Sequence, residues 1–441
     1  MKKIVLFFFL GSMLSCSLWA QRDPLKWPFA DTSIWNMPIG DQAVYIPALI
    51  EPAQAWGMTV DEDILFLDAQ APLLPVMTNY AGWDGSKDRC VEEGPMLFQA
   101  PIPDSFFVSP STWDGLTPNS GAAFLMRDGQ TIKQTQPFSR CFDSIATSQF
   151  VPSDVNLFGE GITGAHGGSG LSAMGGTLRL GELDDPSDTI RHVMKVNLFA
   201  ARNLFYDLQT EGYRWPALRA DGYAPSVYYT QRTLDTVKAC RMGALLALRA
   251  DLQLDSLKLE TQPARILALA FQQYGAYVVD DTYWEVYAMC TEWSPKGRFV
   301  DEFEQAWGYS FSEANKNTPW TRDMAKIFAA LHVVDNNTPN NKGGGGNPIA
   351  PMAPPFLTTQ LPSISSPSKV NWRKIGDFIH VDKPFHSHET LVQLIDLQGR
   401  TIFTAQAKEE ALQIPIPSTR GVYLLRIQSK WESQQHKLVL P

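Results

Sequence analysis

The chain has 441 residues, of which 44% are hydrophobic and 19% are charged, and its formal net charge is −9. This composition is typical of a folded globular protein and excludes a disordered or fibrous one. Because no basic excess offsets phosphate repulsion, the charge argues against nucleic acid and anionic membrane surfaces as partners. Neutral or cationic ligands, small substrates and polysaccharides remain.

Residues 1–20 are predicted to be a signal peptide. Two lysines precede an apolar run over 4–10 that is too short to span a membrane, and Ala20 suits signal peptidase. A lipoprotein anchored at Cys16 is the alternative, which bulky Leu14 disfavours. No later apolar run reaches membrane-spanning length. We therefore expect no transmembrane segment and a protein that is secreted or held at the cell surface.

The cysteine count supports an oxidising compartment. Once the predicted signal peptide is removed, an even number remains, namely Cys90, Cys141, Cys240 and Cys290. One or two disulfides are expected, with three possible full pairings, and four buried thiols are the alternative. Their wide spacing differs from the close cysteine pairs of structural zinc sites, so neither a metal nor a cofactor is predicted.

Residues 22–340 are predicted to form one large, mainly β domain. Apolar or alternating runs separated by proline, glycine and aspartate are typical of short strands, and they lie at 122–126, 177–183 and 190–198. Helices are predicted over 263–274 and from 318 to about 331, each with a proline near its start. We expect a large antiparallel β-sandwich or jelly-roll-like domain with a few helices.

A glycine-rich stretch at 158–170 is the first candidate site. It contains Gly-x-Gly-x-x-Gly, but no helix can begin directly after it, which excludes a dinucleotide site. A glycine-rich backbone can approach a ligand closely, and His166 projects from it as a candidate catalytic residue. A turn held by packing is the alternative.

Glu182 and His192 form the second candidate. We expect a hairpin over 177–198, in which a suitable register would pair the two and raise the pKa of the imidazole. A purely structural pair is the alternative. Arg191 and Lys195 would share the opposite face of the strand.

Asp280 is the third candidate, at the end of a predicted buried strand over 277–281. Adjacent strand residues point to opposite faces, so Asp280 and Asp281 cannot both serve as the carboxylate pair of a glycosidase. The second acid would be Glu182 or Glu160, and a strand-end cap is the alternative.

Aromatic residues indicate a sugar ligand, because aromatic rings cover the apolar faces of sugars. Trp215, Tyr223 and Trp284 are the candidate stacking residues, with Arg191 as a further substrate contact.

The large domain also resembles a recurrent group of uncharacterised secreted bacterial proteins. The shared segments are Trp35-Asn36-Met37-Pro38-Ile39, Gly175 to Leu183, His192, Trp215-Pro216-Ala217 and Tyr274 to Asp280. The resemblance directs attention to Glu182, His192 and Asp280 without implying a reaction.

Residues 341–368, rich in glycine, proline and serine, are expected to be a linker or a segment draped over the first domain. Alternating residues over 369–441 predict a small immunoglobulin-like β-sandwich. This region resembles the C-terminal sorting domain of the type IX secretion system, on the motifs Ile395-Asp396-Leu397-Gln398-Gly399-Arg400, Gly421-Val422-Tyr423-Leu424 and Lys437-Leu438-Val439-Leu440-Pro441. The resemblance implies secretion by that machinery in a Bacteroidetes-like bacterium.

Together these features predict a secreted polysaccharide-degrading enzyme, a glycoside hydrolase with a cleft built from Glu182, His192 and Asp280. One alternative is a polysaccharide lyase with His166 or His192 as base, in which Arg191 or Lys195 neutralises the uronate carboxylate. The other is a non-catalytic glycan-binding or surface-adhesion protein.

Overall fold

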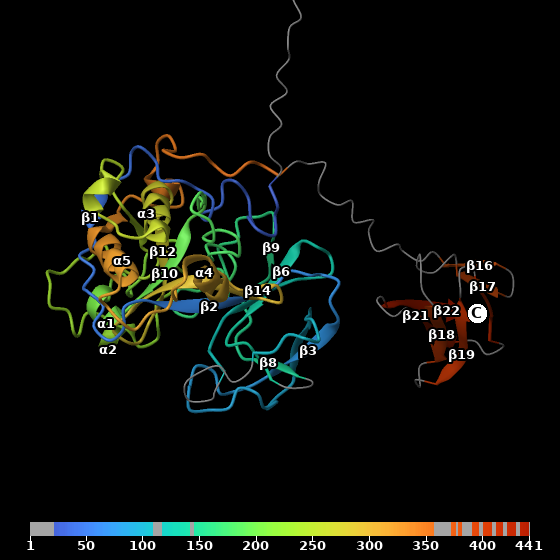
Figure 1. Cartoon of the computed structure of the whole chain (residues 1–441). Helices are drawn as coiled ribbons and strands as arrows, with labels where there is room; N and C mark the ends of the chain where they lie inside the picture. Colours follow the sequence, from blue (N-terminus) through green and yellow to red (C-terminus); the bar gives the residue numbers. More distant parts are fainter. Residues whose placement is uncertain are drawn as a thin grey trace, which may run out of the picture. The chain divides into compact units, whose positions relative to one another are not determined.

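A computed structural model describes residues 22–108, 117–141 and 145–356, and in the C-terminal part 372–375, 378–381, 390–396, 400–407, 412–417, 421–428 and 433–440. The chain divides into two compact units, unit 1 (Met1–Leu357) and unit 2 (Thr358–Pro441) (Figure 1). The predicted signal peptide over 1–20 lies outside the described residues. Among those that are described, no helix has the length and apolar character needed to cross a membrane.

The main sheet of unit 1 has eleven strands. Their order is β1 (Tyr45–Pro47), β15 (His332–Val334), β11 (Leu245–Ala247), β12 (Ala276–Asp281), β10 (Met194–Leu198), β13 (Tyr287–Ser294), β2 (Thr59–Phe66), β5 (Ala122–Leu125), β6 (Thr131–Thr135) and β9 (Val155–Asn156), with β14 (Gly297–Arg298) paired to β13. The mainly β class with few helices is confirmed. The sheet is mixed rather than antiparallel throughout, because β10 runs parallel to β12, and β2 parallel to β13 and β5.

A smaller sheet in unit 1 contains β4 (Met96–Pro101), β3 (Leu73–Thr78), β8 (Ala146–Ser148) and β7 (Ser139–Arg140). Stacked and edge-on phenylalanines, among them Phe66 and Phe124, fill a core shared by the strands of both sheets. Cys90 and Cys141 form a disulfide beside it, whereas Cys240 and Cys290 are buried free thiols. The sequence therefore predicted at least one disulfide correctly.

Both predicted helices are present, as α3 (Gln262–Gln273) and α5 (Pro319–Ala330), and α4 (Phe299–Trp307) is a third. The short elements are α1 (Ala200–Asn203), α2 (Ala224–Val227), and the 3₁₀ turns η1 (Leu254–Leu257) and η2 (Lys342–Gly344). Helix α3 has a proline in its first turn and is followed by Gly275 at φ +76°, which suits a glycine stop.

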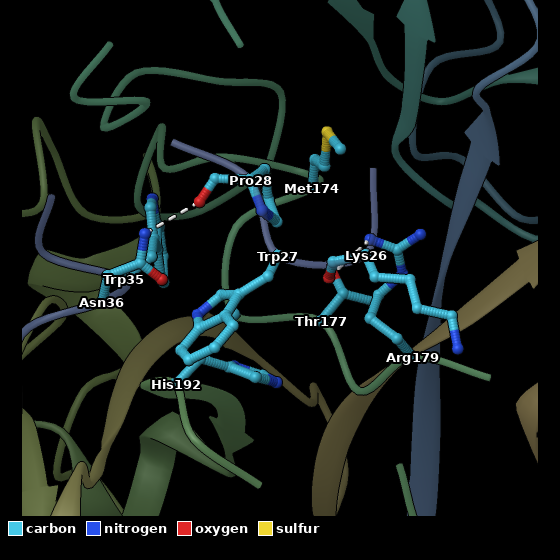
Figure 2. A pocket seen from close by; sticks show the side chains of 10 residues that line it. Lys26, Trp27, Pro28, Trp35, Asn36, Met174, Thr177, Arg179 and His192 are labelled. Atoms are coloured by element: carbon cyan, nitrogen blue, oxygen red, sulfur yellow. Dashed lines mark hydrogen bonds between the residues drawn. The ribbon is translucent and has the colours of Figure 1, made fainter. Parts of the chain in front are cut away.

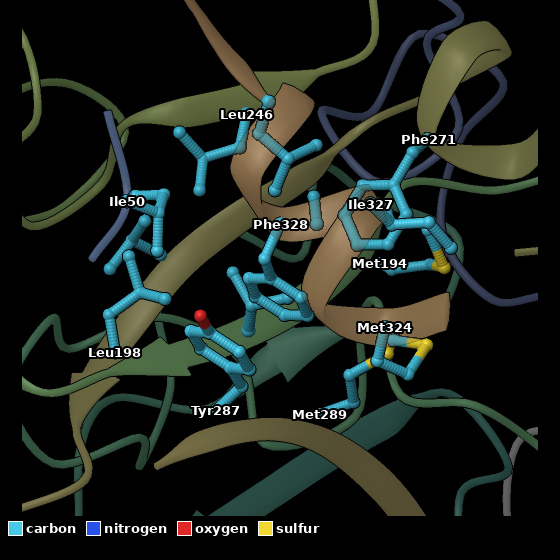
Figure 3. Close-up of a cluster of buried hydrophobic side chains, with 14 of the residues drawn as sticks. Ile50, Met194, Leu198, Leu246, Phe271, Tyr287, Met289, Met324, Ile327 and Phe328 are labelled. Atoms are coloured by element: carbon cyan, nitrogen blue, oxygen red, sulfur yellow. The ribbon is translucent and has the colours of Figure 1, made fainter. Parts of the chain in front are cut away.

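Helices α3 and α5 contribute to the core on one face of the main sheet. Phe271 from α3 and Phe328 from α5 gather with Met194, Leu198 and Tyr287 from the strands (Figure 3). Each fully buried side chain of this size contributes about 2 kcal/mol through the hydrophobic effect. The opposite face of β10 carries polar residues, which leaves it available for a functional site.

The predicted hairpin over 177–198 is wrong. Residues 177–193 contain no strand, and β10 begins only at Met194, where it pairs with β12 and β13. All five residues of β10 are buried, so this strand needs a neighbour on each side, and distant segments supply both.

The first part of the predicted linker packs on unit 1. The backbone of Gly343 accepts a hydrogen bond from Gly40, that of Pro351 accepts one from the Tyr274 hydroxyl, and Ile349 donates to Ile39. Residues 341–356 are therefore a segment draped over this domain. The division at 357/358 lies within the expected range of 341–368.

Unit 2 consists of two antiparallel sheets, β16 (Trp372–Ile375), β17 (Phe378–Val381) and β20 (Leu412–Pro415) in one, and β19 (Thr401–Ala407), β18 (Thr390–Asp396), β21 (Gly421–Gln428) and β22 (Ser433–Leu440) in the other. Alternate residues of β18 and β21, such as Val392 and Leu425, fill its core. Arg400 bonds back to Asp396 with an Nε to Oδ2 distance of 2.7 Å.

Candidate active site

Four neighbouring strands of the main sheet place polar side chains on the face opposite the core of Figure 3. They are Asp280 on β12, Asn197 on β10, Cys290 on β13 and Asp61 on β2. Asn197 lies opposite Asp280, and Cys290 lies opposite Asp61, in the register of the strand pairs. Residues more than 200 positions apart in the chain therefore become direct neighbours.

A β-bulge orients Asp280. Val196 pairs with Val278 while the next residue, Asn197, pairs with Asp280, so Val279 is an extra residue on β12. Such a bulge shifts the alternation of side chains by one, which directs Asp280 to the same face as Asn197.

Asp281 has a different role. Its Oδ1 accepts hydrogen bonds from the backbone nitrogen of Ala200, at the start of α1, and from that of Tyr283. Its Oδ2 accepts one from the Tyr223 hydroxyl at 3.1 Å. Asp281 therefore caps the end of the strand, which is the structural role that the sequence analysis gave as the alternative for Asp280 and Asp281.

His166 lies at the centre of the polar face, 2% exposed. Its Nε2 is 3.3 Å from the Cys290 Sγ and 3.5 Å from the Asp61 Oδ2, and its Nδ1 is 3.4 Å from the Asp280 Oδ2. Burial acts to lower the pKa of His166, but the surrounding carboxylates, Asp280 first, outweigh it and the pKa is raised. The structure thus brings together two of the predicted site residues, His166 and Asp280.

A pocket of about 190 Å³ opens beside this cluster. It is lined by Thr59, Val60, Asp61, Asn119, Gln136, Asn197, Asp280, Asp281, Thr282, Tyr283, Trp284 and Ala288, without a lysine or arginine among these described residues. Gln136 is 3% exposed, and its Oε1 makes no hydrogen bond within the described part of the chain. A buried acceptor without a donor is costly, so this atom marks a place where a bound molecule can donate.

Asp221 lies beside Asp280 on a separate loop, although it is not among the residues that line the pocket. A Cβ on Gly168 would lie 2.9 Å from the Oδ1 atoms of both Asp221 and Asp280, so only glycine fits there. The Gly168 nitrogen donates to Asp280 at 3.1 Å, and the Tyr228 hydroxyl donates to Asp221 at 2.7 Å. Burial raises the pKa of Asp221 to about 7, and the charge of Asp280 adds to this effect.

Glu182 and His192 do contact each other, but elsewhere. Glu182 Oε2 lies 3.1 Å from His192 Nε2, and His192 Nδ1 lies 2.9 Å from the Val193 carbonyl oxygen. Burial acts to lower the pKa of His192, but Glu182 outweighs it and the pKa is raised. The space lined by His192 (Figure 2) is only about 10 Å³, room for no more than one water. Neither residue lines the pocket that contains Asp280.

Of the predicted substrate contacts, some lie at the pocket that contains Asp280, here called the acidic pocket, and others lie elsewhere. Trp284 lines the acidic pocket, and Tyr223 reaches its rim, where its ring centroid lies 6.2 Å from that of Tyr283. Trp215 is partly buried against an apolar cluster, and Arg191 is exposed and does not line the pocket.

No sequence pattern marks Asp61, Asp221 or Cys290 as site residues. Asp221 lies in a loop without a motif, and Asp61 lies in the acidic run Asp61-Glu62-Asp63, which resembles a solvated strand face. The paired glycines after His166 were the available signal, because they indicate a close approach of other groups to the backbone.

The chain matches no family model and no curated protein. Among solved structures, it is similar to β-glucuronidase from Ruminococcus gnavus, at 18% identity in one structure and at 20% in a complex with uronic isofagomine. In both, the match covers 16% of this chain and 14% of the glucuronidase chain, with a TM-score of 0.13. A similarity of this extent identifies neither the family nor the activity of the chain.

Proposed function

We propose that unit 1 is a glycoside hydrolase that cleaves a polysaccharide between Asp221 and Asp280. The observation that carries this proposal is the convergence of both carboxylates on Gly168. Because their Oδ1 atoms lie 2.9 Å from one point, these atoms are at most about 6 Å apart, which is closer than the about 6.5–9.5 Å of inverting glycosidase pairs. Short separations are typical of retaining enzymes.

The two carboxyl groups differ in environment, as an acid and a nucleophile must. With a pKa of about 7, Asp221 is protonated in about half of the molecules at neutral pH and can donate its proton to the glycosidic oxygen as the bond to the anomeric carbon breaks. Asp280, held by the backbone nitrogens of Gly168 and Asp281, would bond to the anomeric carbon. Water, deprotonated by Asp221, would then replace Asp280 and release the sugar.

The pocket wall favours a neutral or amino sugar. Tyr283 and Trp284 offer aromatic faces for stacking, and their side chains are 77% and 40% exposed. A lyase needs a cation near the uronate carboxylate, but Lys195 is bonded to Asp63 at 2.8 Å and Arg191 lies outside the pocket. The lining therefore favours the hydrolase over a lyase that neutralises the uronate with a lysine or arginine side chain.

A substrate panel tests this proposal. Residues 21–441 are incubated with neutral, amino-sugar and uronate polysaccharides, and both reducing ends and the absorbance of unsaturated products are measured. We expect new reducing ends from a neutral or amino-sugar polymer, and their loss in Asp280→Asn. Unsaturated products would identify a lyase. Binding without products would identify a glycan-binding protein.

For unit 2 we infer a sorting role in type IX secretion, with export to the medium or cell surface. The three motifs of the resemblance include residues on β18, β21 and β22, which are neighbours in one sheet, so a single receptor could contact them together. The test is to delete residues 358–441 in a bacterium with this secretion system. Normal release of the truncated protein would contradict the inference.

A further inference from the structure

Three metal-binding side chains from distant parts of unit 1 converge beneath the acidic pocket. Asp61 on β2, Cys290 on β13 and His166 in the glycine-rich loop each offer one ligand atom, and these atoms lie within 4.8 Å of one another. We propose that Asp61, His166 and Cys290 bind a zinc ion. This site does not depend on the glycosidase proposal.

The two distances from His166 to the other proposed ligands agree with tetrahedral zinc. Zinc bonds of about 2.0–2.3 Å to nitrogen, oxygen and sulfur hold neighbouring ligand atoms about 3.3–3.7 Å apart. His166 Nε2 lies 3.3 Å from the Cys290 Sγ and 3.5 Å from the Asp61 Oδ2. A thiolate with an imidazole selects zinc over magnesium or calcium, which prefer oxygen ligands alone.

The surrounding residues are placed as the supports of a metal site. Asp280 lies 3.4 Å from the His166 nitrogen that faces away from Cys290, where it can orient the ring as carboxylates do for metal-bound histidines. Asn197 donates to the Asp61 Oδ2 at 2.7 Å, and its own Oδ1 lies 3.8 Å from the Cys290 Sγ. Asp280 and Asn197 thus support two of the three ligands, His166 and Asp61.

A nucleophilic cysteine is the rival explanation of the same contacts, since Cys290, His166 and Asp280 are ordered as in a thiol hydrolase. Cys290 is 0% exposed and does not line the pocket, so a substrate cannot reach its sulfur. Burial does not hinder a metal ligand.

The site has access to solvent on one side. Asp61 lines the pocket, and so does Gln136, whose Oε1 has no hydrogen-bond partner among the residues that the structure describes. A water from the pocket can therefore complete the zinc coordination and donate a hydrogen bond to Gln136. Three protein ligands with one open position are typical of catalytic rather than structural zinc sites.

Metal replacement tests the proposal without any activity assay. Residues 21–441 are stripped with a chelator and titrated with Zn²⁺, and bound zinc is counted by elemental analysis. Co²⁺ is then used as a spectroscopic substitute. We expect one zinc per chain, and with Co²⁺ a thiolate charge-transfer band that disappears in Cys290→Ser. Asp61→Asn should weaken zinc binding at least about 10-fold, the size of effect expected for a perturbed metal shell.

Cys240→Ser is the matched control. Cys240 is also a buried free thiol but belongs to no cluster of metal-binding side chains in the described part of the chain, so its loss should change neither stoichiometry nor the band. If Cys290→Ser does not fold, the decision falls to Asp61→Asn, on the pocket wall. Substoichiometric zinc in the wild type, or unchanged affinity in Asp61→Asn, would overturn the proposal. Zinc binding without glycosidase activity would support the site and reject only the proposed function.

Discussion

Two buried histidines of unit 1, His166 and His192, both contact carboxylates but differ in the space that adjoins them. Both are almost inaccessible and both contact carboxylates. His192 has a polar partner at each ring nitrogen and adjoins a space for at most one water. His166 has a longer contact, 3.4 Å from its Nδ1 to the Asp280 Oδ2, and a pocket of about 190 Å³ lies alongside. Of the two His–carboxylate contacts, the one at His166 is therefore the candidate functional site, because a pocket adjoins it.

The largest expected difference is between two acids, Asp221 in the region around His166 (the first region) and Glu182 in the region around His192 (the second region). Asp221→Asn removes the proposed general acid and should lower kcat/KM by about 10²- to 10⁴-fold on the polysaccharide that is cleaved. Glu182→Gln, beside His192, should leave kcat/KM within about 3-fold, because it touches no substrate. If Glu182→Gln were the more harmful, the functions assigned to the two regions would have to be exchanged.

Gly168→Ala tests the crowding at the first region. The new Cβ would lie 2.9 Å from Asp221 and Asp280 and 2.7 Å from the Met242 Cε, and should lower kcat about 10- to 100-fold by displacing the carboxylates. Gly222→Ala, next to Asp221, is the control because nothing lies within 4 Å of its Cβ position. Equal activities of the two variants would refute the carboxylate pair.

The pocket rim should contribute a smaller effect through KM. Trp284→Ala removes a stacking surface worth about 0.5–1.5 kcal/mol, so KM should rise about 2- to 10-fold with little change in kcat. Trp83→Ala is matched in exposure, at 44% against 40%, and does not line the pocket. An equal rise in KM for both variants would show that the rim does not bind the sugar.

In the second region, around His192, substitutions should change the free energy of unfolding rather than the activity. The pKa of His192 is raised in the folded protein, so its pairing with Glu182 stabilises fully below the unfolded pKa of about 6.5 and is lost as pH rises through the folded-state value. Glu182→Gln should therefore lower the free energy of unfolding by about 1 kcal/mol at mildly acidic pH and by less at alkaline pH. Denaturant titrations across this range measure it, and a deficit that grows with pH would contradict the sign.

The smallest effect is a shift in the pH profile. Asp221 must be protonated to act as an acid, so activity should fall as pH rises above about 7. The groups that act on its pKa are Asp280, Asp281 and the Tyr228 hydroxyl, which lowers it by a hydrogen bond. Tyr228→Phe should move the alkaline limb upwards by a fraction of a pH unit. A downward shift would mean that another group sets the limb.

The parts of the fold that the sequence predicted correctly are those marked by a pattern within their own residues. Helix α3 has a proline near its start and a glycine at its end, and β18 and β21 alternate residue by residue in unit 2. The hairpin over 177–198 was wrong because the neighbours of β10 come from segments about 80 residues further along the chain. Pairing between distant strands leaves no local trace in sequence.

The residues of the candidate site also differ in whether a local sequence pattern marks them. His166 and Asp280 could be named in advance, because a glycine-rich loop and carboxylates at the end of an apolar strand are local patterns. Asp61, Asp221 and Cys290 could not, since each acquires its chemistry from groups on other strands and loops.

The amino-acid sequence alone determines a mainly β class, the two long helices and the strands of the C-terminal unit. It also indicates two residues of the candidate site, His166 and Asp280. Folding adds what no local pattern contains. The bulge at Val279 turns Asp280 toward His166, parallel pairing brings Cys290 opposite Asp61, and Gly168 lets Asp221 approach. Burial and the neighbouring charges then shift the pKa values of His166 and Asp221, because charge interactions depend on distance and solvent access rather than on order along the chain.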